Sequence, residues 1–316
     1  MTKPNGTSGI MHDWTASDIP LQSGRQALVT GTGGLGLETA LALARAGASV
    51  IIAGRDRAKG ASAVSRILAN VPRARVAFEA LDLADLASVH AFGQRLRTAL
   101  PRLDLLINNA GVMTPPQRRL TADGFELQLG TNHLGHFALT AQLLPLLRQG
   151  IQPRVVTLSS IAARSGAIDF ANLQSERVYK PMTAYAQSKL ACLMFALELQ
   201  RRSDAEGWGL QSLAAHPGVS RTDLLPNGAG ARSAAGLARR YLWFLFQPAA
   251  QGALPTLHAA TSPQARGGAY YGPDRLGETR GYPVVVRIPA QALDVGASAK
   301  LWEVSARLTG ARFNGG

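Results

Sequence analysis

The sequence predicts a single α/β domain, in which one doubly wound parallel sheet has helices on both faces. Short apolar segments alternate with helical patterns from about residue 26 to residue 215. These segments are continuously apolar, which is typical of parallel strands buried on both faces. The chain has 316 residues, 46% hydrophobic and 17% charged, enough for a large core. This composition excludes collagen, coiled coils and intrinsic disorder.

The predicted elements alternate in order along the chain. We expect strands at residues 27–29, 50–53, 76–78, 103–107, 155–158 and 210–214. We expect helices at residues 35–44, 59–70, 84–100, 125–148 and 184–202, then a final edge strand and loop at 267–273 and a short helix at 301–308. No linker or repeat divides the chain, so residues 23–316 are predicted to form one domain after a partly disordered extension, 1–22.

Charge and cysteine content exclude several classes of protein. The net charge is +13, and 28 of the 33 basic residues are arginines scattered singly or in pairs. This scatter favours a solvated surface over a nucleic-acid partner. The single Cys192 excludes an intramolecular disulfide, and no metal site is expected. Because no apolar run approaches the ~20 residues of a membrane span and no signal peptide is recognisable, we expect a cytoplasmic protein without membrane association.

A glycine-rich turn follows the first predicted strand. Gly31, Gly33 and Gly36 fit the pattern G-x-G-x-x-G between a strand and a helix. Glycines at these positions allow a tight turn and a close approach of the backbone to a pyrophosphate, which would rest on the helix N-terminus. The pattern predicts a Rossmann-type dinucleotide site; a glycine-rich turn without a ligand is the alternative.

The end of the second strand indicates which dinucleotide binds. Sites for NAD usually place an acidic residue there, whereas this chain has Ala53-Gly54-Arg55. A guanidinium suits a 2′-phosphate, which a carboxylate would repel. We therefore predict NADP(H), with NAD(H) as a second option; the alternative is that Arg55 is an ordinary surface residue.

A tyrosine and a lysine lie one helical turn apart at Tyr185 and Lys189. The lysine favours the phenolate, and the phenol can exchange a proton with an alcohol oxygen. Other polar segments follow separate strands: Asn108-Asn109-Ala110-Gly111, Ser159-Ser160 and His216-Pro217-Gly218. Because open α/β sheets bind ligands at the carboxyl ends of their strands, we expect these segments to meet at one site.

In this order of motifs the chain resembles the short-chain dehydrogenase/reductase family, from about Trp14 to Phe313. Within the family it is most similar to the retinol-dehydrogenase-like branch, on the segments Thr131–Phe137, Ile168–Phe170, Ser175–Arg177 and Tyr185–Leu190. The resemblance implies an oxidoreductase that transfers a hydride between nicotinamide and the carbonyl or hydroxyl carbon of a hydrophobic substrate.

The resemblance also implies a role for each matching residue. Tyr185 is the general acid/base, Lys189 favours its phenolate and holds the nicotinamide ribose, Ser160 hydrogen-bonds the substrate oxygen, and Asn132 positions a water in a proton relay. The implied cofactor-binding residues are Gly31, Thr32, Gly33, Gly34, Leu35, Gly36, Arg55, Asp82, Leu83, Asn109, Ala110, Gly111, Tyr185, Lys189, Pro217, Gly218 and Thr222.

The chain departs from the family at the glycine turn. The family pattern T-G-x-x-x-G-x-G has three residues between its first two glycines, whereas only Thr32 and Gly33 separate Gly31 from Gly34. This removes a side chain that often caps the phosphates. The alternative function is therefore a catalytically weak dinucleotide-binding sensor or scaffold.

Two other segments suggest substrate and partners. The resemblance implies that an insertion at residues 164–181 walls the substrate site and that the apolar residues 224–255 form a lid over a hydrophobic alcohol, ketone or aldehyde. That apolar segment could instead contact another subunit or a membrane. The helices at 125–148 and 184–202 resemble the pair through which family members dimerise, so we expect a homodimer or homotetramer.

Overall fold

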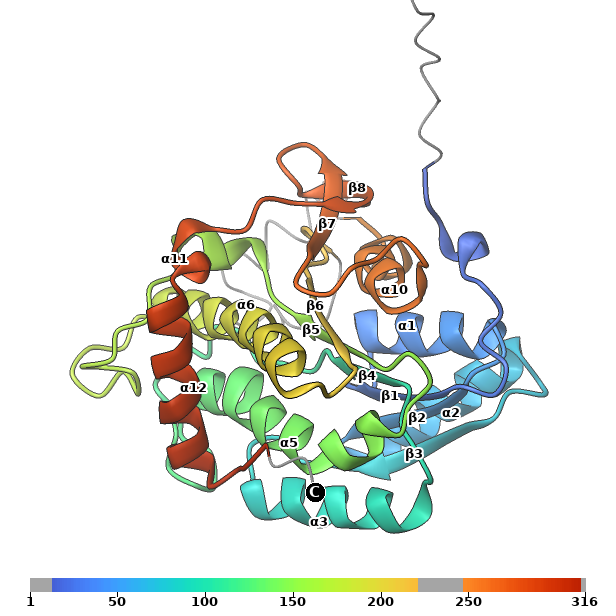
Figure 1. The fold of residues 1–316 in the computed structure, drawn as a ribbon, viewed down its shortest axis with the longest axis horizontal. Coiled ribbons are helices and arrows are strands. Elements are labelled where there is room, and N and C mark those ends of the chain that lie inside the picture. The colour runs from blue at the N-terminus through green and yellow to red at the C-terminus, as the bar shows by residue number, and fades with distance from the viewer. Residues whose placement is uncertain (1–12, 221–246, 314–316) are drawn as a thin grey trace, which may run out of the picture.

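Eight β-strands form one sheet in the described part of the chain, residues 13–220 and 247–313 of a computed structural model (Figure 1). The strands are β1 (Gln26–Thr30), β2 (Ser49–Gly54), β3 (Val76–Ala80), β4 (Leu105–Asn108), β5 (Arg154–Leu158), β6 (Gln211–Ala215), β7 (Tyr270–Arg275) and β8 (Arg280–Val285). Their order is β3-β2-β1-β4-β5-β6-β7-β8. The strands up to β7 pair in parallel, and the predicted doubly wound α/β fold is confirmed.

The chain reverses its winding direction between β1 and β4, which lie side by side. β1 to β3 extend toward one edge of the sheet, and β4 to β8 toward the other. At such a switch point the loops after adjacent strands diverge and leave room for a ligand at the carboxyl ends. The glycine turn after β1 and the Asn108–Gly111 segment after β4 therefore lie at the switch point.

Helices cover both faces of this sheet (Figure 1). On one face, α1 (Gly34–Arg45), α2 (Arg57–Asn70) and α10 (Leu254–Thr261) pack on side chains such as Val29 and Ile52. On the other, α3 (Leu86–Ala99), α5 (Gly135–Arg148) and α6 (Pro181–Glu206) pack on side chains such as Leu28 and Leu106. Residues adjacent in a strand point to opposite faces, so each apolar strand contributes to both cores.

Local sequence sets where several helices begin and end. The Asp56 carboxylate caps α2 by accepting from the Lys59 backbone N–H, and Asp85 caps α3 in the same way. Pro181 occupies the first position of α6, where no backbone donor is needed. Gly207 ends α6 in the left-handed conformation, at φ 65°.

The predicted helix at residues 125–148 is interrupted. It consists of α4 (Leu127–Leu129), a five-residue π-helical turn, η2 (Gly130–Leu134), and then α5. Apolar spacing does not reveal one extra residue in a turn, so the prediction missed this break. Asn132 lies inside the π-turn, and such turns are frequent at functional sites.

The predicted final edge strand is β7, and its position at the edge is wrong. β7 pairs in parallel with β6 and antiparallel with β8, which forms the true edge. β8 contains Gly281 and Pro283, residues that weaken a strand signal and that sheets tolerate at an edge. Most of the predicted lid at residues 224–255 lies outside the described residues. Its described part, residues 247–255, forms α9 (Ala249–Gly252) and the start of α10. Gln247, Ala253 and Leu254 in this part are buried.

The C-terminal helix α12 (Val295–Thr309), longer than predicted, lies against α5 and α6 after the short α11 (Ala290–Leu293) (Figure 1). The Trp302 ring centroid lies 4.9 Å from that of Phe137 and 5.8 Å from that of Phe195, one residue from each of these helices. The guanidinium of Arg202 lies 4.5 Å from the Trp302 ring centroid. α12 thus packs on α5 and α6, the two helices that resemble the pair through which family members dimerise.

The start of the described chain lies against the domain. A short 3₁₀ helix, η1 (Ala16–Asp18), follows Trp14, whose ring makes an edge contact with His258 at 5.1 Å. In the described ranges, no helix is long and apolar enough to cross a bilayer.

Candidate active site

The glycine turn requires glycine for its backbone path. Gly31 and Gly34 have φ values of +100° and +50°, and a Cβ atom on Gly36 would lie 2.5 Å from the carbonyl oxygen of Gly31. α1 begins at Gly34, and its N-cap residue is Gly33, which has no side chain to cap the helix. The N-cap residue therefore places no side chain over the helix N-terminus, which has the polarity that suits a pyrophosphate. The residues present fit a dinucleotide, even with the shortened turn.

Thr30 links the ends of β1 and β4. Its hydroxyl accepts from the backbone N–H groups of Asn109 and Ala110 at 2.9 and 3.0 Å, while the Asn109 side chain donates to the Thr30 carbonyl at 2.6 Å. The same amide nitrogen lies 2.6–2.7 Å from where Cβ atoms on Gly31 and Gly36 would be. The Asn109 side chain thus fixes the glycine turn against the loop after β4.

His136, which the sequence suggested is packed or solvent-facing, is buried in this network. Its Nδ1 lies 2.9 Å from the Asn132 carbonyl oxygen, which can only accept, so Nδ1 carries the proton. Its Nε2 then accepts from the Thr30 hydroxyl at 2.9 Å. Burial lowers the pKa of His136 to about 4, and the neutral ring connects the Asn132 turn to the glycine turn.

Asn132 uses its whole side chain to hold the site together. Its Oδ1 accepts from the Val112 N–H at 2.8 Å, and its Nδ2 donates to the Val112 carbonyl and the Ser188 hydroxyl. A Cβ atom on Gly111 would lie 2.9 Å from Asn132 Oδ1 and 3.6 Å from Lys189 Nζ. The structure therefore brings the loop after β4, the π-turn and α6 together at Gly111.

The two serines after β5 face different ways. Ser159 is buried and its hydroxyl donates to the Lys189 carbonyl at 2.8 Å, which fixes α6 to the strand end. Ser160 is partly exposed; its hydroxyl caps the 3₁₀ helix η3 (Ile161–Ser165) by accepting from the Ala162 N–H at 3.2 Å. Ser160 is thus the member of the pair with a hydroxyl proton available to a ligand.

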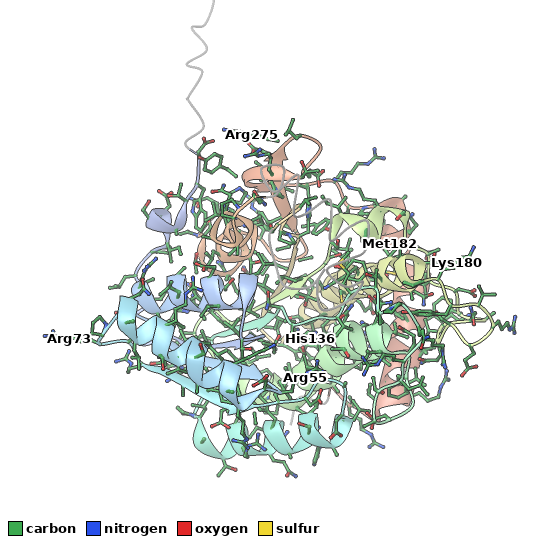
Figure 2. All side chains as sticks on the ribbon, turned by 180° about the vertical axis from the view of Figure 1, so that it is seen from behind. Arg55, Arg73, His136, Lys180, Met182 and Arg275 are labelled. Carbon is green, nitrogen blue, oxygen red and sulfur yellow. The ribbon has the colours of Figure 1, made fainter. Side chains whose placement is uncertain are left out.

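Tyr185 and Lys189 lie one turn apart on α6, which begins near Lys180 and Met182 (Figure 2). Both side chains are buried, at 6% and 5% exposure, and Lys189 Nζ donates to the Leu158 carbonyl at 3.0 Å. Leu158 ends β5, directly before the serine pair. This bond places the ammonium at the carboxyl edge of the sheet, beside Gly111.

The residues predicted to bind the adenosine end follow β2 and β3. Arg55 is exposed directly after β2 (Figure 2) and has no ion pair with any residue that the structure describes. A Cβ atom on Gly54 would lie 2.9 Å from the Thr32 methyl group. Gly54 ends β2, where NAD sites usually have an acidic residue, and the Thr32 methyl group leaves little room for a side chain at this position. Asp82 accepts from the Ala84 N–H, and Leu83 is buried.

The Pro217–Gly218 segment after β6 is held from several sides. Gly218 has φ 63°, and the Ser220 hydroxyl and Gln247 Nε2 donate to the Pro217 carbonyl at 2.7 and 2.6 Å. Ser220 and Gln247 also form an isolated β-bridge, so the chain leaves and re-enters the described structure at neighbouring points. The predicted carboxamide ligand Thr222 lies outside the described residues.

The insertion at residues 164–181 is bound to the site by buried amide side chains. Gln187, within the Tyr185–Lys189 turn, accepts from the Asp169 N–H and donates to the Leu173 carbonyl. Gln128 on α4 donates to the Tyr179 hydroxyl and the Pro181 carbonyl. Burial, reinforced by Glu126, raises the pKa of Tyr179 to about 12. These bonds hold the insertion beside Tyr185, and its role as a wall of the substrate site stays a prediction.

Sequence reasoning missed one group beside the site. Glu278, in the turn between β7 and β8, bonds both to His216 and to Arg164. The sequence suggested a structural role for His216, but a glutamate in a distant turn carries no motif that links it to the site. Within the described ranges, no cluster of His, Cys, Asp and Glu side chains is suited to a metal ion.

Buried histidines predict how stability depends on pH. Burial lowers the pKa of His133 to about 3, below its unfolded value near 6.5. Between these values the unfolded chain binds a proton that the folded chain does not, so stability falls as pH falls below 6.5. We expect His133→Gln to reduce the slope of unfolding free energy against pH by roughly 1.4 kcal/mol per pH unit. Urea unfolding of the wild type and the variant from pH 7 to 4.5 measures this slope. Equal slopes in the two proteins would contradict a lowered pKa for His133.

A family model and similar proteins of known name both indicate one family of dehydrogenases. Residues 25–229 match the model of the family described as short chain dehydrogenase. Polyprenol dehydrogenase of Mus musculus is 42% identical over 307 residues, which cover 95% of this chain and 88% of that protein. Retinol dehydrogenase 12 of Mus musculus is 38% identical, over 92% of this chain and 88% of its own.

Solved structures agree in fold. An uncharacterized protein from Mycobacterium Paratuberculosis is 41% identical with a TM-score of 0.79, over 96% of this chain and 99% of its own. A short chain dehydrogenase from Burkholderia cenocepacia J2315, crystallised in complex with NADP, is 26% identical with a TM-score of 0.58, over 76% of this chain and 92% of its own.

Proposed function

Because the chain belongs to the short-chain dehydrogenase/reductase family, in its retinol-dehydrogenase-like branch, we propose that it is an NADP(H)-dependent oxidoreductase of hydrophobic alcohols and carbonyl compounds. The observation that supports this most strongly is the hydrogen-bonded connection between the proposed catalytic segments. Lys189 bonds to the end of β5, Ser159 bonds back to Lys189, and Asn132 bonds to the Ser188 hydroxyl. Such support holds reacting groups in position before a substrate arrives.

In the proposed mechanism, bound NADPH supplies the hydride that reduces the carbonyl carbon. The Ser160 hydroxyl donates a hydrogen bond to the carbonyl oxygen and orients it. The Tyr185 hydroxyl gives its proton to that oxygen as negative charge develops. The Lys189 ammonium, one turn away, stabilises the phenolate that remains. In alcohol oxidation the phenolate takes the proton back.

The cofactor assignment combines the glycine cradle with Arg55. The cradle suits a pyrophosphate, and the exposed guanidinium after β2 suits a 2′-phosphate. The NADP complex of the similar Burkholderia cenocepacia enzyme supports this choice, with NAD(H) as the second option.

The substrate class comes from the apolar sequence of residues 224–255 and from the names of the relatives. Polyprenols and retinol are the alcohols in those names, so we propose a long apolar alcohol or its aldehyde or ketone. A cytoplasmic location and a homo-oligomer without nucleic acid remain predictions from the sequence. A sensor or scaffold would bind the dinucleotide without turnover, and only the shortened glycine turn favours it.

A homologous series of straight-chain aldehydes tests this proposal. If the substrate chain is buried, each added methylene should raise kcat/KM with NADPH by about fourfold, until the site is filled. NADPH oxidation is followed by absorbance, and cofactor binding by fluorescence titration. Binding without turnover of any aldehyde would favour the scaffold, and turnover independent of chain length would refute the apolar site.

A further inference from the structure

The turn between β7 and β8 has an unfavourable backbone. Leu276, Gly277 and Glu278 have φ values of 48°, 65° and 68°, and the left-handed region is disfavoured for leucine and glutamate. Such a conformation persists only when its surroundings hold it in place. Here the surroundings are the two loops that follow β5 and β6.

The Glu278 side chain joins these two loops. Its Oε2 lies 2.9 Å from His216 Nε2 and forms an ion pair with Arg164, which lies in η3 four residues after Ser160. His216 is fully buried, and its Nδ1 accepts from the Gly218 N–H at 3.3 Å. Nε2 must therefore carry the ring proton, so a neutral His216 donates to Glu278. Burial, the dominant influence, lowers the pKa of His216, consistent with the neutral ring.

The backbone of the turn packs on the same loops. The Thr279 carbonyl accepts from the Val219 N–H at 2.7 Å, and a Cβ atom on Gly218 would collide with that carbonyl. Room for the His216 ring comes from Gly272, where a Cβ atom would collide with Nε2. On the other side, Arg164 also donates to the Gly277 carbonyl at 3.4 Å.

A second contact ties this hairpin to Ser160. The Tyr270 hydroxyl, from β7, donates to the Ser160 carbonyl at 3.3 Å, and the Tyr270 ring lies 5.1 Å from that of His216. One hairpin therefore contacts both the segment assigned to the substrate oxygen and the segment assigned to the nicotinamide. A shift of either loop would change the alignment between substrate and cofactor.

We propose that Glu278 is a positioning residue, which fixes the Pro217–Gly218 loop through His216 and the Ser160 loop through Arg164. This inference rests on the proposed function, because the two loops are assigned to nicotinamide and substrate there. It adds a residue from the C-terminal hairpin to the machinery. The two contacts of Glu278 should have separate effects. The contact with His216 should affect NADPH binding, and the contact with Arg164 should affect binding of the carbonyl substrate.

Three variants and one control test the proposal. Glu278→Ala removes both contacts and should raise the NADPH dissociation constant and the aldehyde KM by about tenfold each. Glu278→Gln keeps an acceptor for His216 but loses the ion pair, so it should restore NADPH binding to within about threefold of wild type while the aldehyde KM stays high. Arg164→Gln should reproduce that second pattern. Glu303→Ala, an exposed glutamate on α12, is the matched control and should change neither constant.

The outcomes distinguish this inference from the proposed function. A merely structural glutamate would lower the melting temperature and the active fraction but leave both constants of the folded enzyme unchanged. Wild-type constants in Glu278→Ala, or a loss of NADPH binding in Glu278→Gln as large as that in Glu278→Ala, would overturn the positioning role. If the wild-type protein itself neither binds NADPH nor reduces an aldehyde, the proposed function fails instead.

Discussion

Replacing Tyr185 by phenylalanine should lower kcat by about 10³-fold while NADPH still binds, because the variant lacks only the proton that the carbonyl oxygen requires. The ring of Tyr185 is buried, so phenylalanine keeps its packing. Lys189 keeps its bond to the Leu158 carbonyl, which does not depend on the phenol. Single-turnover NADPH oxidation measures the loss, and fluorescence titration measures binding.

The matched control for this experiment is Tyr282→Phe. Tyr282 lies on the edge strand β8, where its ring faces the Arg275 guanidinium at 5.0 Å, and loss of its hydroxyl should leave kcat unchanged. Turnover retained by Tyr185→Phe would assign the proton transfer to another group. Loss of NADPH binding in the same variant would instead indicate a collapsed site.

Arg55→Asp should reverse the cofactor preference. The carboxylate would repel a 2′-phosphate and could accept from the ribose hydroxyl of NAD, so the ratio of kcat/KM for NADPH to that for NADH should fall by at least about 10²-fold. Because Arg55 is exposed, stability should change little. Steady-state kinetics with both cofactors gives the ratio.

Arg73→Asp is the control for charge alone. Arg73 lies beyond the far end of α2 from Arg55 (Figure 2), about 20 Å away along the 14-residue helix. If the ratio of kcat/KM for NADPH to that for NADH changed equally in both variants, the effect would come from the net positive charge of the protein and not from a contact of Arg55 with the 2′-phosphate. Gly54→Asp, the more obvious route to an NAD site, should fail alone because its side chain would meet the Thr32 methyl group.

The sequence predicted the parallel sheet well, because its strands are buried on both faces and read as continuous apolar runs. Each of the six strands before residue 216 lies within about two residues of its predicted place, as β5 at Arg154–Leu158 illustrates. The edge strand β8 was missed because an edge strand tolerates Gly281 and Pro283. The π-turn at Asn132 was missed because an extra residue in a turn leaves the apolar spacing nearly unchanged.

The site was predictable where a motif is local. Tyr185 and Lys189 share one helical turn, and Ser160 directly follows a strand, so their shared edge follows from the parallel sheet. Contacts between distant segments were not predictable in this way. Nothing in the sequence near Glu278 indicates that its turn reaches His216, and nothing near His136 indicates that Thr30 is its partner.

The packing of α12 on α5 and α6 also determines when the fold can be completed. Phe137 and Phe195 are synthesised long before Trp302 and Phe313, the aromatic residues that cover them. As the chain emerges from the ribosome, this aromatic surface stays exposed until α12 has been synthesised and has packed, and exposed surfaces of this kind promote aggregation. The completed fold therefore depends on α12, and a chain truncated before Val295 would expose an apolar surface beside an otherwise assembled sheet.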